Sequence, residues 1–198
     1  MGRQKSQDNR DRILDIAITL FAERGVRGVS TREITDAADL TKPMLYYYFK
    51  DKQGLITAIL DIHMNELYEA IEEVTAGDRS VEECLREFVR VRFRQVMARP
   101  DVMRFQFAFY NGPDLALVPD EYQEQHSRIN AVVSDLIQKG CETGIFRPDL
   151  LPNIAATVFE GAYKELIRSY LLRGRPELTD ENADAVVETV LRGLRNTV

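Results

Sequence analysis

Residues 42–52 concentrate phenol and ammonium groups in a short stretch of chain. Tyr46, Tyr47 and Tyr48 are consecutive, with lysines before and after them. If the segment is helical, successive side chains point about 100° apart, so the three phenols cannot all face a protein core. Exposed phenol and ammonium groups donate hydrogen bonds to phosphate oxygens, and aromatic edges contact thymine methyl groups. The segment is therefore a candidate surface for binding nucleic acid.

Two short helices must position these groups. Ser30 and Glu33 have the spacing of a capping box, in which each side chain bonds the other residue's backbone N–H, so a helix is predicted to start after Ser30. Thr41 is a good N-cap for the tyrosine-rich helix, and Pro43 is acceptable because it lies in the first turn. Asp39 suits the intervening turn, since it tolerates the left-handed conformation. Such a pair forms a helix-turn-helix, whose second helix enters the DNA major groove.

Helical periodicity and capping signals extend through the rest of the chain. Apolar residues recur at helical spacing, and no segment shows convincing alternation of apolar and polar residues. Glycine, proline and capping residues divide the chain into segments. Besides the two short helices, the predicted helices cover residues 11–24, 52–75, 81–98, 100–110, 121–141, 152–173 and 179–194. The expected fold class is all-α, with about nine helices.

Charge is unevenly distributed along the chain. The net charge of −6 argues against nucleic-acid binding when it is considered alone. Residues 1–52, however, hold ten Lys and Arg against eight Asp and Glu, whereas the remainder holds sixteen against twenty-four. The basic excess lies near the start of the chain, at Arg3, Lys5, Arg10 and Arg12. A cationic head on an acidic body is typical of a modular DNA-binding protein, and a solvated polar tail would produce the same pattern.

Several kinds of site and location are disfavoured. Cys84 and Cys141 have neither metal-site spacing nor a disulfide framework, and the chain has two histidines and no glycine-rich phosphate loop. We therefore expect no metal, no cofactor and no catalytic residues. The first residues lack the apolar segment of a signal peptide, and no apolar run approaches the roughly 18 residues that span a bilayer. We expect a cytoplasmic protein without a membrane partner.

The segment from Gly28 to Leu55 resembles the DNA-binding signature of the TetR family of transcriptional regulators. The resemblance implies a three-helix helix-turn-helix DNA-binding domain at residues 1–51. Residues 52–198 would form a helical domain for effector binding and dimerisation. The expected function is that of a ligand-responsive regulator, most often a repressor. It would bind a pseudo-palindromic DNA operator as a homodimer and be released by a small-molecule effector.

The resemblance also implies a set of DNA contacts. Residues at the start of the backbone-crossing helix would touch phosphates, and those in the next helix would face bases or the adjacent backbone. The implied DNA-binding residues are Thr31, Arg32, Thr41, Lys42, Pro43, Met44, Tyr46, Tyr47, Tyr48 and Lys52. Among them, Tyr46 and Tyr48 occupy backbone-clamping aromatic positions, and Lys52 the position of a phosphate-contacting lysine. The chain departs from the family's usual residues at Thr35, Asp39 and Pro43.

The last two helices are the expected dimer interface. A helix-turn-helix monomer reads few base pairs, so such proteins usually dimerise. Helix 152–173 has two apolar faces, and a helix of this kind buries one face in its own core and the other against a partner or a further part of the same chain. The family's dimers pair these two helices from each chain. The expected interface residues are Val158, Gly161, Leu172, Val186, Val187, Val190 and Leu191.

Two polar residues interrupt apolar helix faces and are candidate effector contacts. Arg92 needs an anionic partner if buried, either Glu160 or Glu165 of this chain or an acidic effector. His63 is either a core or interface histidine or a ligand contact. By the resemblance, an amphipathic or aromatic small molecule would bind between the helices of the second domain. The candidate contacts are His63, Arg92, Phe93, Phe105, Phe109, Tyr110, Phe159 and Tyr163.

Two other interpretations remain at this point. A helical interaction module without DNA binding would explain the helices, but not the tyrosine-rich segment or Lys52. An enzyme is the other alternative, and deleting residues 1–52 would leave an enzyme's activity but abolish a repressor. DNA binding alone does not decide between a repressor and an activator.

Overall fold

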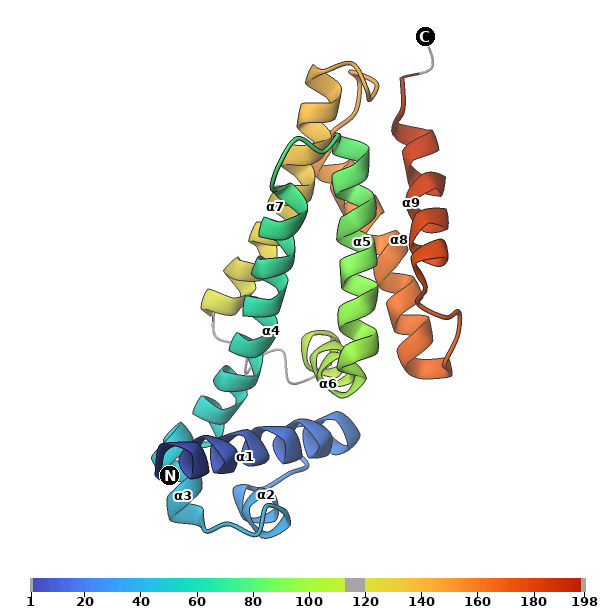
Figure 1. Ribbon diagram of the computed structural model, residues 1–198. Coiled ribbons are helices and arrows are strands. Elements are labelled where there is room, and N and C mark those ends of the chain that lie inside the picture. Colours follow the sequence, from blue (N-terminus) through green and yellow to red (C-terminus); the bar gives the residue numbers. More distant parts are fainter. Residues whose placement is uncertain (1, 113–119, 197–198) are drawn as a thin grey trace. The chain divides into compact units, whose positions relative to one another are not determined.

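The computed structural model describes the backbone of residues 2–112 and 120–196, and within these ranges all side chains except those of 2–5, 63, 110, 111 and 120–129. The residues so described form nine α-helices and no strand, which confirms the all-α prediction (Figure 1). The helices are α1 (Gly2–Arg24), α2 (Thr31–Ala37), α3 (Lys42–Phe49), α4 (Lys52–Thr75), α5 (Val81–Ala98), α6 (Pro100–Asn111), α7 (Asp120–Glu142), α8 (Pro152–Arg173) and α9 (Asp180–Leu194).

The helix boundaries agree with the predicted ones to within a few residues, with one exception. Helix α1 begins at Gly2, whereas apolar periodicity predicted a start at Asp11. The segment before Asp11 is polar, so the periodicity of buried residues does not reveal that it is helical. None of the helices in the described ranges combines the length and apolar character that crossing a lipid bilayer requires.

The chain forms two compact units. The first unit comprises residues 1–65 and 99–119, and the second comprises residues 66–98 and 120–198. Helix α4 therefore contributes residues to both units, and α6 belongs with the N-terminal helices. The functional division into residues 1–51 and 52–198 stays a prediction.

Aromatic packing holds α6 against α1 in the first unit. The Phe105 ring centroid lies 5.8 Å from that of Phe21 on α1 and 5.3 Å from that of Phe109. All three rings are buried. Burying a side chain of this size typically stabilises a fold by about 1.5–3 kcal/mol. The first unit therefore has an aromatic core beside its short α2 and α3 helices.

Local signals end and start the helices of the first unit where they were predicted. Gly25 has φ of 70° and ends α1, as expected for a glycine at C′. The Glu33 N–H donates to Ser30 Oγ at 3.2 Å, and the Ser30 N–H donates to Glu33 Oε2 at 2.8 Å. These bonds, with Arg24 beside them, lower the pKa of Glu33 from 4.5 to about 2. Asp51 caps α4 by accepting from the Gly54 N–H at 2.7 Å. The predicted capping box is confirmed.

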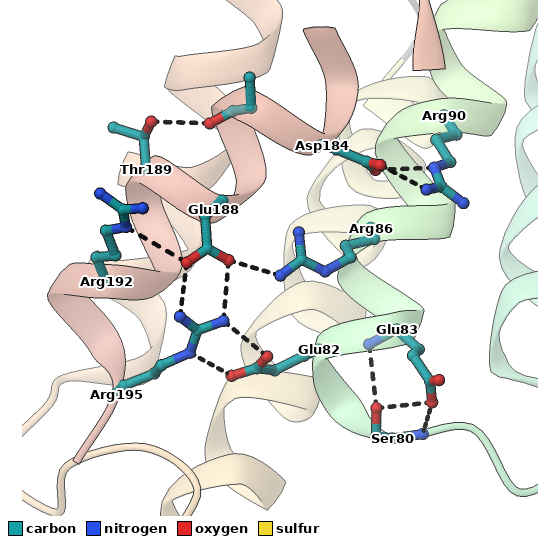
Figure 2. Close-up of polar contacts among 11 residues, drawn as sticks. Ser80, Glu82, Glu83, Arg86, Arg90, Asp184, Glu188, Thr189, Arg192 and Arg195 are labelled. Atoms are coloured by element: carbon teal, nitrogen blue, oxygen red, sulfur yellow. Dashed lines mark hydrogen bonds and ion pairs between the residues drawn. The ribbon is translucent and has the colours of Figure 1, made fainter. Parts of the chain in front are cut away.

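A series of ion pairs joins α5 to α9 in the second unit (Figure 2). We call these pairs the α5–α9 charge ladder: Glu82–Arg195, Arg86–Glu188, Arg90–Asp184 and Arg94–Asp180, at 2.8, 2.7, 2.6 and 3.3 Å. Arg195 also donates to Glu188, and the bonds from Arg195 and Arg86 lower the pKa of Glu188 from 4.5 to about 2. The pairs recur every four residues along α5, from Glu82 to Arg94. Their partners Asp180, Asp184 and Glu188 are also four residues apart on α9, and Arg195 directly follows that helix. The pairs therefore specify the register of α9 on α5.

Candidate nucleic-acid interface

Helices α2 and α3 divide their side chains cleanly between the core and the surface. Ile34, Leu45 and Phe49 are buried, with exposed fractions of 0, 0 and 4%. On the opposite side of α3, Tyr46 is 45% exposed and Tyr47 is 79% exposed. Apolar residues exposed singly are ordinary, whereas neighbouring exposed ones can mark an interaction site. The buried residues therefore fix α3, while its outer face presents phenols to solvent.

The turn between α2 and α3 adopts the geometry that Asp39 was predicted to allow. Asp39 has φ of 52°, in the left-handed region, and the Leu40 N–H donates to the Thr35 carbonyl at 3.0 Å. Thr35 itself is buried, and its hydroxyl donates to the Arg32 carbonyl at 2.9 Å. A buried hydroxyl with a partner carries little penalty. Asp39 and Thr35, two of the departures from the family's usual residues, therefore fit this turn: Asp39 adopts the left-handed backbone, and the buried Thr35 hydroxyl has a hydrogen-bond partner.

Most of the predicted DNA-binding residues lie on this outer surface. Arg32 is exposed and has only a long contact of 3.5 Å with Asp36, its neighbour one turn later. Thr31 and Met44 are half-buried. The exposed residues of the set are Arg32, Thr41, Lys42, Pro43, Tyr46 and Tyr47. The arrangement places hydroxyl, ammonium and aromatic groups around one end and one face of α3.

Tyr48 is engaged inside the first unit. Its hydroxyl lies 3.1 Å from the Ser6 hydroxyl on α1, and its ring packs edge-on against that of Tyr47, with centroids 5.1 Å apart. The Tyr48 hydroxyl therefore already has one partner within the chain. Sequence reasoning did not identify Ser6, because no local pattern connects residues 42 positions apart.

Lys52 is also engaged inside the first unit. Its ammonium group donates to the carbonyl oxygens of Val26 and Val29, and lies 5.7 Å from the Phe21 ring centroid. The two carbonyls belong to the connection between α1 and α2. Lys52 therefore joins the start of α4 to this connection. Its contact with a DNA phosphate stays a prediction, and that contact would compete with these internal hydrogen bonds.

Comparison with known proteins finds similar regulators of transcription. The profile described as "Bacterial regulatory proteins, tetR family" matches residues 13–59, which include all of α2 and α3. The HTH-type transcriptional repressor KstR2 of Rhodococcus jostii is 28% identical over 189 residues, covering 93% of this chain and 90% of that protein. Residues 13–59 thus resemble the DNA-binding part of TetR-family regulators, and the chain is similar to a repressor along most of its length. The HTH-type transcriptional regulator AcrR of Shigella flexneri is 37% identical over 67 residues, covering 34% of this chain and 31% of that protein.

Solved structures of TetR-family regulators share the fold along nearly the whole chain. The fatty acid degradation regulator FadR from Bacillus halodurans superimposes with a TM-score of 0.81 at 22% identity, covering 95% of this chain and 97% of that one. The ketosteroid transcriptional regulator KstR2 of Mycobacterium tuberculosis superimposes with a TM-score of 0.73 at 20% identity, covering 94% and 95% of the two chains. These relatives are regulators of transcription, not enzymes.

The candidate effector contacts are distributed over both compact units. Phe105 and Phe109 pack in the core of the first unit. Phe93, Phe159 and Tyr163 are buried in the second unit, with exposed fractions of 0, 1 and 2%. The side chains of His63 and Tyr110 lie outside the described residues. The aromatic residues are therefore mostly core, and their role toward an effector stays a prediction.

Arg92 is buried in the second unit, with a neutral partner at hydrogen-bond distance. It is 7% exposed and donates to Gln95 Oε1 at 2.6 Å, while Gln95 Nε2 donates to the Glu66 carbonyl at 2.8 Å. Burial lowers the pKa of Arg92, and nearby Tyr163, Glu160 and Glu66 oppose that effect. Burial also raises the pKa of Tyr163.

Of the two predicted carboxylate partners for Arg92, Glu160 lies in its surroundings and Glu165 does not. Glu160 is 5% exposed and accepts from Lys164, and its Oε1 has no hydrogen-bond partner within the described residues. Glu165 instead pairs with Arg168, three residues along α8. The prediction for Glu165 is therefore wrong, because the side chain lies on the exposed side of the helix.

An open pocket of about 180 Å³ lies beside this cluster in the second unit. Its lining residues are Glu66, Glu69, Ala70, Glu73, Val91 and Gln95. Sequence reasoning missed these residues, since glutamates at helical spacing have the appearance of a solvated face. Gln95 belongs both to this lining and to the hydrogen bond with Arg92.

The predicted dimer residues divide into exposed and buried groups. Val158 and Leu172 on α8 are 59% and 62% exposed, and Gly161 between them has open space around it. Val187 and Leu191 on α9 are buried, with exposed fractions of 1 and 0%, and so belong to the core of the second unit. Val186 and Val190 are half-buried. A partner chain would therefore meet α8 and the flank of α9, not Val187 or Leu191.

Proposed function

We propose that the protein is a transcriptional repressor that binds operator DNA through α3 as a homodimer and is released by a small-molecule effector. The observation that carries the proposal is the outer face of α3. Tyr47 is largely exposed on a helix whose inner residues Leu45 and Phe49 are buried. The second helix of a helix-turn-helix lies in the major groove, where such a face meets base edges and phosphates. The repressors among the relatives support the sign of regulation.

The exposed apolar side of α8 supports the homodimer. Three large apolar side chains lie on one side of this helix and are exposed to solvent: Ile154, Val158 and Leu172, with exposed fractions of 54, 59 and 62%. Gly161 lies on that side and would allow close approach of a second helix, because nothing lies within 4 Å of where its Cβ would be. An isologous contact of this surface with its copy would present two α3 helices to successive turns of DNA.

The effector is proposed to be an apolar or amphipathic small molecule. The buried aromatic residues and Arg92 of the second unit support this class, since ligand sites combine apolar walls with few polar groups. The names of two relatives, a ketosteroid regulator and a fatty acid degradation regulator, point to lipid-like compounds. Such an effector changes DNA affinity only if it binds the DNA-bound and free conformations with different affinities.

Footprinting of the full chain on the intergenic DNA beside its own gene tests the operator proposal. The expected result is one protected pseudo-palindromic segment. Absence of any protected segment at low salt would contradict it. Sedimentation should give a dimer at micromolar concentration, and Val158→Asp should give a monomer. Ala131→Asp, at an exposed position of α7 where no interface residue is predicted, provides the control.

A thermal-shift screen that begins with steroid acids and fatty acids tests the effector proposal. A true effector should raise the melting temperature and also lower the affinity for the footprinted segment. A compound that stabilises the protein but leaves DNA affinity unchanged is not the effector. A reporter gene controlled by the footprinted segment then distinguishes repression from activation.

A further inference from the structure

Helices α5 and α8 bury a polar cluster in the second unit. Arg92, Glu160 and Tyr163 are 7, 5 and 2% exposed. The Tyr163 ring lies edge-on to that of Phe88, with centroids 5.8 Å apart, and Phe88 precedes Arg92 by about one helical turn. Glu160 precedes Tyr163 by about one turn of α8. The Arg92 guanidinium therefore lies near the Tyr163 phenol and the Glu160 carboxylate, and both oppose the effect of burial on its pKa.

Hydrogen bonds within the chain leave this cluster incomplete. Arg92 donates to Gln95 Oε1 at 2.6 Å, and Glu160 accepts from Lys164. Among the described residues, however, no ion pair joins Arg92 to Glu160, and Glu160 Oε1 has no hydrogen-bond partner. A buried carboxylate oxygen without a partner is costly, because it has lost its hydration. The fold therefore keeps an acceptor available near a buried cation.

The surroundings of the cluster are aromatic. The Phe159 ring lies edge-on to that of Tyr163, with centroids 5.9 Å apart, and both Phe88 and Phe159 are buried. Burial raises the pKa of Tyr163, so its phenol stays neutral. A few polar groups in otherwise apolar surroundings are the composition typical of small-molecule sites.

Gln95 connects the cluster to the surface. Its amide oxygen accepts from Arg92, and its amide nitrogen donates to the Glu66 carbonyl at 2.8 Å. The same side chain lines the open pocket of about 180 Å³, to which Ala70 and Val91 contribute apolar walls. A ligand in this pocket would therefore meet Gln95, and a ligand oxygen that replaced the Gln95 amide oxygen would bond to Arg92.

The two opposite charges restrict the ligand group that fits between them. A guanidinium only donates hydrogen bonds, and a carboxylate only accepts them. An alcohol does both, so its oxygen can accept from Arg92 while its O–H donates to Glu160. A ligand carboxylate has no proton to donate and would be repelled by Glu160, whereas an ether accepts from Arg92 but leaves Glu160 unpaired.

We propose that Arg92 and Glu160 bind one hydroxyl group of the effector, with Arg92 donating to its oxygen and Glu160 Oε1 accepting from its O–H. The effector is then a neutral, largely apolar alcohol. The inference rests on the proposed function, whose amphipathic effector it narrows to one polar group. Gln95 is a positioning residue, because its hydrogen bond holds the Arg92 guanidinium.

Isothermal titration calorimetry of the full chain with matched probes tests this assignment. Decanol, decyl methyl ether and decanoate share an alkyl chain, and androstanol with its methyl ether repeats the comparison on a rigid ring system. An alcohol should bind about tenfold more tightly than its ether, because the ether cannot donate to a charged acceptor. Decanol should also bind more tightly than decanoate. The absence of an alcohol preference on both scaffolds would overturn the inference, and is expected if only water lies between the two side chains.

Glu160→Gln separates recognition of the hydroxyl from a purely structural role. The amide keeps the shape of the side chain but removes the charge that repels an acid, so the preference for decanol over decanoate should reverse. Glu165→Gln makes the same change at an exposed position of α8, where the carboxylate pairs with Arg168, and should keep the wild-type preference. An unreversed preference in Glu160→Gln, or the same reversal in the control, would overturn the inference. Circular dichroism confirms folding, and if Glu160→Gln does not fold, the probe comparison on the wild-type chain decides.

DNA release distinguishes failure of this inference from failure of the proposed function. The alcohol that binds more tightly than its ether should also release the chain from the footprinted segment. Release by decanoate or by an ether, but not by an alcohol, would overturn the inference and leave the proposed function supported. A chain that does not bind the segment contradicts the proposed function itself, whatever the calorimetry shows.

Discussion

The outer face of α3 and the α5–α9 charge ladder use their polar groups in opposite ways. On α3, no hydrogen bond or ion pair is found for the side chains of Lys42 and Tyr47 within the described part of the chain, and Tyr47 is 79% exposed. In the ladder, arginines of α5 are paired with carboxylates of α9 at 2.6–3.3 Å. One surface leaves its donors available, and the other satisfies them within the chain.

This difference shows why arginine content alone does not locate a DNA-binding surface. A phosphate gains little from a guanidinium that already has a carboxylate partner, because the new contact must replace the old one. The surface that binds an external anion is the one whose donors lack partners inside the protein. The same criterion separates Lys42 from Lys52, since the ammonium group of Lys52 donates to two backbone carbonyls.

The largest expected effect comes from removing the core beneath α3. Leu45 is fully buried, so Leu45→Ala should lower the free energy of unfolding of the first unit by about 2–5 kcal/mol and abolish DNA binding. Urea unfolding with circular dichroism measures the loss. Leu151→Ala, at a position 66% exposed, should change stability by less than about 0.5 kcal/mol. A loss below about 1 kcal/mol for Leu45→Ala would show that α3 does not depend on this core.

Lys52→Met decides between the two roles of that lysine. If the ammonium group mainly holds the carbonyls of Val26 and Val29, the substitution should lower the free energy of unfolding by about 1–3 kcal/mol. The salt slope of DNA binding should then stay at its wild-type value. If instead the slope falls by about 0.9 with stability unchanged, the lysine binds phosphate and the internal bonds are secondary.

Tyr47→Ala should separate DNA binding from stability. Tyr47 is exposed, so the free energy of unfolding should change by less than about 0.5 kcal/mol. Affinity for the footprinted segment should fall by about tenfold, corresponding to about 1.4 kcal/mol, through loss of phosphate or base contacts. Anisotropy measures the affinity, and Tyr47→Phe assigns the loss to the hydroxyl or the ring. Unchanged affinity in Tyr47→Ala would exclude this face of α3 from the interface.

The smallest expected effect is the pH dependence of the charge ladder. The pKa of Glu188 is about 2 in the folded chain and 4.5 without its arginine partners, so the folded state binds fewer protons between these values. The ladder's contribution is therefore complete above pH 4.5 and is lost as the pH falls toward 2. Glu188→Gln should unfold more easily than wild type at pH 6, with a smaller difference at pH 3, in urea titrations at both pH values. If the variant and wild type differed in stability by the same amount at pH 6 and pH 3, the ion pairs of Glu188 would not be the cause of the difference.

Most of the secondary structure, and the exposure of phenols on α3, were predictable from the sequence. The Ser30–Glu33 box, Gly25 and the left-handed Asp39 are signals in which each group and its partner lie within a few residues. Such interactions form as soon as the helix forms, so the sequence contains both participants. The start of α1 was missed because residues 2–10 carry no apolar periodicity.

Tertiary structure alone decided which groups are already satisfied. The Ser6–Tyr48 contact and the bonds from Lys52 to Val26 and Val29 join residues more than twenty positions apart. An apolar stripe shows that Val187 will be buried, but not whether its own chain or a partner covers it. The sequence by itself determined that a tyrosine-rich helix exposes some of its phenols, which we propose contact DNA. The packing of distant helices decided which of its neighbours remain available, because burial and pairing depend on what the fold brings together.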